Sequence, residues 1–241
     1  MLESRINFST ENILEDEKNI RPIPAKMNIP EWFKKLQHTP TNQTIKGCMP
    51  FLDALSAGYL LRLSQDFILQ HNQEIDKKEP QTALVPALRQ GHENAQQLNL
   101  NVGPEAHAQV QLEGSPLLEK NKKFPIHKFL NCWYIKTPPG YSCLFVPPLN
   151  NADDRFEIIS GIVDTDVFPG RVNFPFAVNG YKYPKLDTVL KQGTPYVQVI
   201  PFKRQRWKMN LSFLETKDAP KRNLKNTFKF HSKLYHVYKT R

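Results

Sequence analysis

Two segments give the strongest indication of the fold of this chain: Gly161-Ile162-Val163-Asp164-Thr165-Asp166 and Gly193-Thr194-Pro195-Tyr196-Val197-Gln198-Val199-Ile200. Both lie within residues 140–202, where β-branched and aromatic runs are separated by Pro- and Gly-rich turn sequences. No helical pattern intervenes between these runs. A series of short strands of this kind predicts a mainly β domain, built as a barrel or a sandwich.

The same alternation extends upstream and sets the expected elements. Strands are predicted at residues 129–136, 141–146, 156–163, 171–178 and 196–202, and residues 45–69 predict one or two more, joined at 56–58. One short amphipathic helix is predicted at residues 30–36. Pro30 and Glu31 suit a helix start there, and Trp32 shares a face with Leu36.

Three segments follow from this pattern. Residues 1–43 form an N-terminal arm with the short helix, residues 44–202 form the β domain, and residues 203–241 form a C-terminal extension. Within the domain, residues 72–123 are polar and weakly periodic, which predicts a long insertion with a helical turn at 83–88.

The charge of the chain is unevenly distributed. The net charge is +10, and residues 201–241 contain the whole excess, because residues 1–200 hold equal numbers of basic and acidic side chains. A basic segment of this kind suits phosphates or an acidic protein surface, and it equally suits a solvated amphipathic extension whose aromatic residues pack on the domain.

Several site classes have little support. The 3 cysteines form no CxxC pair, and the 7 histidines show no metal-binding spacing, so we expect no metal site. No run approaches the roughly 20 apolar residues of a membrane span. We expect a soluble protein with no membrane partner, located in the cytoplasm, or in the host cytoplasm or the virion if a phage encodes it.

The order of the motifs resembles the trimeric dUTPase and dCTP deaminase superfamily. Ala57-Gly58-Tyr59-Leu60-Leu61 is similar to the first family motif, Gly161 to Gly170 to the third and Gly193 to Gln198 to the fourth. The resemblance covers residues 45–202 without the insertion. It implies a dUTPase-like β-clip or jelly-roll-like barrel and a homotrimer.

The resemblance also implies roles for individual residues. Asp164 stands at the water-activating aspartate, Phe168 near the tyrosine that packs under the deoxyribose, and Gln198 at a phosphate-contacting glutamine. Arg171 and Asn173 would face the same pocket. Independently of the resemblance, Lys203 and Arg204 directly follow the Gln198 strand and could replace phosphate contacts that the family pattern loses.

Other parts of the family pattern are replaced. Pro147-Pro148-Leu149-Asn150 stands where the family has Pro-Arg-Ser-Gly, and the glycine-rich C-terminal flap with its arginine is absent. These replacements remove charge-assisted bonds worth about 1.5–3 kcal/mol each. The chain also resembles a family of uncharacterised tailed-phage and marine bacterial proteins, through segments such as Ile29-Pro30-Glu31-Trp32 and Gln198-Val199-Ile200-Pro201-Phe202-Lys203-Arg204, and that family implies no activity.

Asp164 and Asp166 have two interpretations. Two residues apart on a strand, they would share a face, where they can bind a cation or activate water together. Alternatively, they accept main-chain N–H bonds in a tight hairpin. Both interpretations stay open at this point.

The basic run after the last strand also has two interpretations. Arg206, Trp207 and Lys208 suit single-stranded nucleic acid, where a base stacks on the indole and the cations meet phosphates. They equally suit a basic edge that discourages sheet aggregation. Further basic candidates for a nucleic acid or an acidic partner are Lys221, Arg222 and Lys225.

Three functions follow from these alternatives. The first is a non-catalytic, phage-type binding or structural module for assembly, on a scaffold whose nucleotide pocket is degenerate. The second is a deoxynucleotide-binding enzyme or sensor that uses Asp164 and Gln198, with Mg²⁺ as the only cofactor. The third is nucleic-acid binding through the basic C-terminal region.

Overall fold

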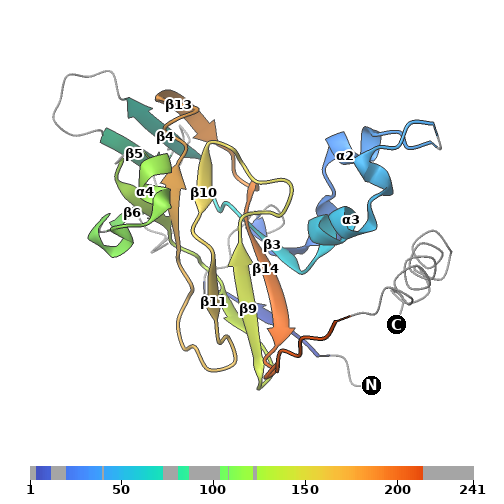
Figure 1. The fold of residues 1–241 in the computed structure, drawn as a ribbon. Coiled ribbons are helices and arrows are strands. Elements are labelled where there is room, and N and C mark those ends of the chain that lie inside the picture. The colour runs from blue at the N-terminus through green and yellow to red at the C-terminus, as the bar shows by residue number, and fades with distance from the viewer. Residues whose placement is uncertain are drawn as a thin grey trace. The chain divides into compact units, whose positions relative to one another are not determined.

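A computed structural model describes residues 4–11, 20–39, 41–72, 81–86, 104–107, 109–121 and 124–213. The chain divides into two compact units, Met1–Arg204 and Gln205–Arg241. Within the described residues, the strands and helices belong to the first unit (Figure 1). Of the second unit, the description covers residues 205–213.

Antiparallel strands are the predominant secondary structure among the described residues of the first unit, which confirms the prediction of a mainly β protein. The strands are β1 (Asn7–Ser9), β2 (Ile23–Pro24), β3 (Tyr59–Arg62), β4 (Phe67–Asn72), β5 (Gln81–Pro86), β6 (Pro104–His107), β7 (Ile126–Phe129), β8 (Tyr134–Lys136), β9 (Tyr141–Val146), β10 (Phe156–Ile158), β11 (Gly161–Val163), β12 (Phe174–Val178), β13 (Lys185–Leu190) and β14 (Pro195–Lys203).

The described strands form four sheets. A five-stranded sheet has the order β11-β9-β14-β3-β2, a four-stranded sheet β10-β12-β7-β6, a three-stranded sheet β13-β4-β5, and β1 pairs with β8. Each sheet ends in open edges, and no closed barrel is found among the described strands. The finer expectation of a dUTPase-like barrel therefore stays a prediction.

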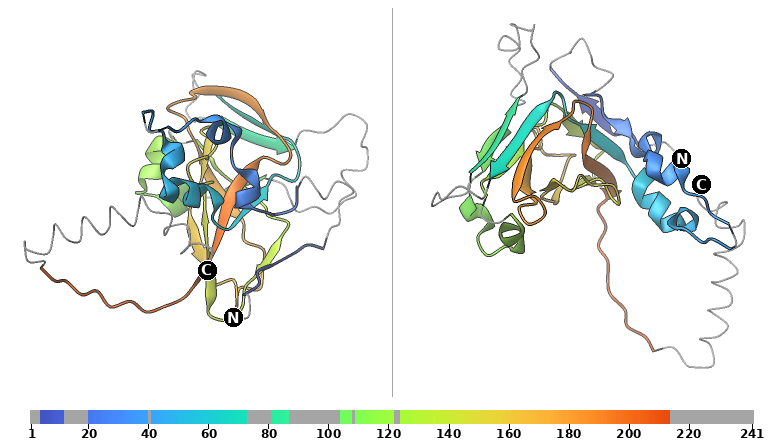
Figure 2. Two further views of the ribbon diagram at one scale, coloured as in Figure 1. Left: turned by 90° about the vertical axis from the view of Figure 1, so that its right-hand side faces the viewer. Right: turned by 90° about the horizontal axis from the view of Figure 1, so that it is seen from above.

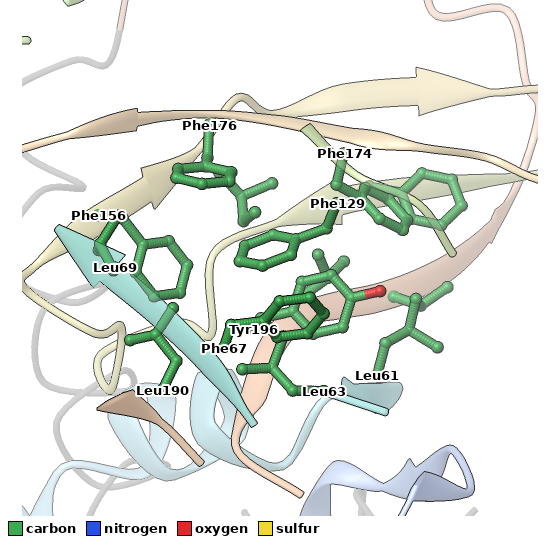
Figure 3. Packing of buried hydrophobic residues seen from close by; sticks show 14 of the residues in the cluster. Leu61, Leu63, Phe67, Leu69, Phe129, Phe156, Phe174, Phe176, Leu190 and Tyr196 are labelled. Carbon is green, nitrogen blue, oxygen red and sulfur yellow. The ribbon is translucent and has the colours of Figure 1, made fainter. Parts of the chain in front are cut away.

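An aromatic core lies where strands of three sheets meet (Figure 3). Phe129 of β7 stacks on Phe176 of β12 with ring centroids 4.5 Å apart, and it contacts Tyr196 of β14 at 5.2 Å. The ring centroid of Phe67 on β4 lies 5.6 Å from that of Phe129. Side chains of this size contribute roughly 1.5–3 kcal/mol each when fully buried, so this cluster stabilises the arrangement of the sheets.

The helices are short. They are η1 (Ala25–Asn28), α2 (Glu31–Lys35), η2 (Ile45–Gly47), α3 (Met49–Ser56), η4 (Gln109–Leu112) and α4 (Pro116–Lys120). Those from residues 25–56 lie to one side of the sheets in Figure 1 and in the right-hand view of Figure 2. Helix α2 confirms the prediction at residues 30–36, and its Phe33 stacks on Phe51 of α3 at 5.9 Å.

Five sequence-based assignments differ from the structure. The predicted strand at residues 129–136 is divided between β7 and β8, which belong to different sheets. Residues 45–56 form η2 and α3 rather than a strand, and Pro50 in the first turn of α3 is the helix signal that the strand interpretation overlooked. Residues 81–86 form β5 rather than a helical turn. The run 156–163 divides into β10 and β11, which belong to different sheets. Strand β13, with its alternating charged residues, was not predicted.

Candidate functional site

The two aspartates of the Gly161-to-Asp166 motif lie in a turn that follows β11. The main-chain oxygen of Asp164 accepts hydrogen bonds from the N–H groups of Val167 and Phe168, at 3.0 and 2.9 Å. Strand alternation therefore does not set the direction of the two carboxylates. The prediction that they share a strand face is wrong because the strand ends at Val163.

Arg204 nevertheless brings both carboxylates together. Its Nη1 lies 2.8 Å from Asp166 Oδ1 and 3.1 Å from Asp164 Oδ1, and its Nη2 contacts Asp166 Oδ2. Nη1 also donates to the main-chain oxygen of Tyr141 and to Ser142 Oγ, at 3.2 and 3.1 Å. The hydrogen bonds with Asp166 raise the pKa of Arg204 above its ordinary value.

The carboxylate of Asp166 already accepts hydrogen bonds at both of its oxygens. Its side chain is only 5% exposed, and Oδ2 also accepts the main-chain N–H of Gly140 at 2.8 Å. Hydrogen bonds from Arg204 and from Gly140 lower the pKa of Asp166 to about 2. A permanently ionised, enclosed carboxylate of this kind holds two loops together and is a poor proton acceptor.

Asp164 is the more accessible of the two acids. Its side chain is 54% exposed, and Oδ1 accepts a hydrogen bond of 2.6 Å from Ser142 Oγ on β9. Ser142 itself is fully buried. A single accessible carboxylate beside a guanidinium can accept a proton or meet a cation, but it lacks a second accessible acid in this cluster.

The other polar side chains next to the turn are buried and make hydrogen bonds with one another. Thr165 is buried, and its hydroxyl lies 2.7 Å from Thr137 Oγ1 and donates to Cys143 Sγ at 3.3 Å. Burial raises the pKa of the Cys143 thiol. The thiol is therefore no candidate nucleophile.

Gln198 lies on β14 and does not face the aspartate cluster. It is 1% exposed, and its Oε1 accepts the main-chain N–H of Leu149 at 2.8 Å. Its Nε2 donates to the oxygens of Ala54 and Ala57, at 2.9 and 2.7 Å. The amide joins β14 to the end of α3 and to the loop after β9, and both of its polar atoms are used.

The remaining residues predicted for the nucleotide pocket do not gather around Asp164. The guanidinium of Arg171 lies 5.4 Å from the ring centroid of Tyr134, and Asn173 Oδ1 accepts the main-chain N–H of Asn131 at 3.1 Å. Phe168 is 41% exposed at the end of the turn. Lys203 is exposed at the end of β14.

Three partners in the cluster were not among the predicted site residues. They are Gly140, Tyr141 and Ser142, which all act at the turn into β9. Alternation over Tyr141-Ser142-Cys143 indicated a strand but not a cluster, because the pairing of β9 with β11 and β14 is a long-range property.

A pocket lies elsewhere in the domain. Its lining includes Ser64, Asn131, Trp133 and Tyr196, and its volume of about 10 Å³ is room for about one water molecule. None of the predicted site residues lines it. This pocket therefore does not correspond to a nucleotide site.

The basic candidates of the C-terminal extension belong to the second unit. Arg206, Trp207 and Lys208 are exposed, and Trp207 is 86% exposed. Lys221, Arg222 and Lys225 lie outside the described residues.

Comparison of the sequence with protein-family models and with curated proteins gives no match. Among the described residues, no three His, Cys, Asp or Glu side chains are grouped as metal ligands would be. Within the same residues, no helix has the length and apolar character needed to cross a bilayer.

Proposed function

We propose that this chain is a non-catalytic binding and assembly module. The proposal rests on Gln198, whose side-chain amide makes hydrogen bonds of 2.7–2.9 Å with three main-chain groups. Releasing it for a phosphate would leave those part-buried main-chain groups without this partner, at up to about 1–3 kcal/mol for each group.

Asp166 supports the same conclusion. It is enclosed and paired with Arg204, so the one cation brought to this cluster is already neutralised by two acids. A triphosphate needs several convergent donors with unspent charge. The cluster instead ties the end of β14 to the start of β9 and to the turn after β11.

The resemblance described above adds two parts to the proposal. The module would stand on a degenerate dUTPase-like scaffold of phage type, and it would assemble as a homo-oligomer, a trimer in the family pattern. Its binding surfaces would be formed by the apolar and basic side chains that are exposed to solvent and not packed in the core of the first unit.

A thermal-shift screen tests the non-catalytic character. Deoxynucleoside triphosphates and monophosphates are added with and without Mg²⁺ to wild type, to Asp164→Ala and to Asp187→Ala, an exposed acid on β13 that serves as the matched control. We expect no shift in Tm with any nucleotide. A shift produced by one nucleotide, retained in Asp187→Ala and lost in Asp164→Ala, would overturn the proposal in favour of a nucleotide enzyme or sensor.

Nucleic-acid binding is the second candidate, favoured by the exposure of Trp207 between Arg206 and Lys208. It predicts binding of an oligodeoxythymidine that weakens steeply with salt and is lost in Trp207→Ala. Fluorescence anisotropy at low salt measures it. The control is Trp32→Ala, because Trp32 is a half-exposed indole of the first unit.

A further inference from the structure

The segment Gln205–Phe213, called the arm below, has the pattern of a strand without a sheet. Apolar side chains occupy every second position, at Trp207, Met209, Leu211 and Phe213, and their exposed fractions are 86, 84, 82 and 105%. Side chains at alternate positions share one face of an extended chain. Figure 2 shows this stretch as extended, without a helical turn.

Residues 205–213 also belong to no helix or strand, so their main-chain groups have no partner within a regular element. An open sheet edge can accept such a segment as an additional strand. The edge supplies hydrogen-bond partners for the main chain of the segment, and it places alternate side chains beside a row of side chains on the sheet.

One edge of the five-stranded sheet matches the arm. On its outer face, Ile200, Leu144 and Ile162 form a row across β14, β9 and β11, since Ile200 and Ile162 are both register partners of Leu144. Ile162 ends the row at the open edge and is 64% exposed. Val167 and Phe168, which are 68 and 41% exposed, follow in the adjoining turn.

Other edges carry the features that discourage pairing. Strand β13 presents exposed Lys185 and Asp187, β10 contains Glu157, and the two-residue β2 contains Pro24. Charged side chains and proline at an edge oppose the addition of a strand. Among the edge strands of the larger sheets whose side chains are described, β11 has neither a charge nor a proline.

The charges of the arm and of this edge are complementary. The arm carries Arg206 and Lys208 and no acid, whereas β11 is followed by Asp164, whose side chain is 54% exposed. We propose that the arm of one copy adds as a strand to the β11 edge of a second copy of this chain. This inference rests on the proposed assembly function and names its partner.

A second copy is the occupant because one chain carries both halves of the contact. The unpaired apolar strand and the open apolar edge are different surfaces, so their pairing is head-to-tail and the copies close into a ring or continue as a filament. Arg204 holds the point where the arm begins, through its contacts with Asp164, Asp166 and Tyr141.

Light scattering coupled to size-exclusion chromatography tests the contact with the full chain. The arm variant replaces Trp207, Met209, Leu211 and Phe213 by Ser, and the edge variant is Ile162→Lys. The matched controls are Asn210→Ser with Ser212→Asn on the other face of the arm, and Val189→Lys on the β13 edge. We expect wild type and both controls to be oligomeric and both test variants to be monomeric.

Mixing the arm variant with the edge variant distinguishes loss of the contact from misfolding. The arm variant keeps an intact edge and the edge variant keeps an intact arm, so an equimolar mixture is expected to form a one-to-one heterodimer. A monomeric wild type, an oligomer that persists in the arm variant, or a mixture that stays monomeric would each overturn the inference. A monomeric wild type whose arm binds oligodeoxythymidine would assign the arm to nucleic acid.

The two proposals fail separately. A nucleotide-dependent rise in Tm that requires Asp164 would contradict the non-catalytic module and leave the oligomer measurement unaffected. An oligomer that forms without nucleotide binding and persists in the arm variant would contradict the contact between arm and edge alone. A monomeric wild type would contradict both that contact and the proposed homo-oligomer.

Discussion

The guanidinium of Arg204 meets the carboxylate of Asp166 at both oxygens, with Nη1 2.8 Å from Oδ1 and Nη2 in contact with Oδ2. A two-point pair of this kind has a defined direction as well as charge. It joins the residue after β14 to the turn after β11. The pair thereby links two segments that are distant in the sequence.

Acid should weaken this joint in a defined range of pH. The pKa of Asp166 in the folded chain is about 2, below the ordinary 3.8, so the unfolded chain binds the proton first as the pH falls. The stabilisation is complete above 3.8 and is lost as the pH approaches 2. Denaturant unfolding of wild type and Asp166→Asn over this range should give a free-energy difference that narrows with acid. A difference independent of pH would contradict the assignment.

Gln198→Ala should destabilise the domain by roughly 2–4 kcal/mol, because it opens a cavity at a buried side chain and removes the hydrogen-bond partner of three part-buried main-chain groups. Urea unfolding measures the loss. Gln70→Ala is the control, since Gln70 is exposed and makes one side-chain bond to Asp187. Equal effects of the two substitutions would show that the Gln198 amide is not a structural tie.

Gly58→Ala should cost more than Gly114→Ala, although both glycines have positive φ, at 63° and 79°. A Cβ at Gly58 would lie 2.0 Å from the main-chain oxygen of Val199, whereas one at Gly114 meets nothing within 4 Å. The control therefore carries only the conformational cost of about 1–2 kcal/mol. Thermal unfolding of both variants separates the clash from that cost, and a Tm for Gly58→Ala equal to that of the control would contradict the close approach.

His71 should make the domain less stable in mild acid. It is 4% exposed, packs on the ring of Phe124 at 4.7 Å, and its Nε2 lies 2.5 Å from the main-chain oxygen of Tyr183. Burial lowers the pKa of His71 below its ordinary 6.5, so the unfolded chain binds the proton first and stability falls as the pH drops below 6.5.

The measurement is the change in Tm between neutral and mildly acidic buffer, which His71→Gln should reduce. The exposed His38 supplies the control His38→Gln. An unchanged pH dependence in His71→Gln would contradict the prediction.

Local patterns predicted the elements whose signals are local. Strand β9 matches residues 141–146 because alternating apolar residues between two Pro- and Gly-rich turns leave few alternatives. The same rule was wrong at residues 45–56, where apolar residues spaced for a strand also fit a helix that begins near Pro50. It also joined β10 to β11, since a change of sheet at residues 159–160 leaves no mark in hydrophobicity.

The candidate site was less predictable than the strands. Asp164, Asp166 and Arg204 were each singled out, yet their meeting depends on the pairing of β9 with both β11 and β14. Arg171 and Asn173 were placed by the resemblance at the same pocket, and the fold directs them to residues 131–134 instead.

Alternation and charge are properties of neighbouring residues, so they predict the β-rich character of the domain, the short helix at residues 31–35 and the concentration of positive charge after residue 200. The contacts of the polar residues depend on the tertiary structure. Asp166 is enclosed by Gly140 and Arg204, which lie 26 and 38 positions away, and Gln198 is consumed by Ala54, 144 positions away. Burial and hydrogen bonding between distant segments arise when the sheets assemble, and they determine whether a carboxylate or an amide is left for a ligand.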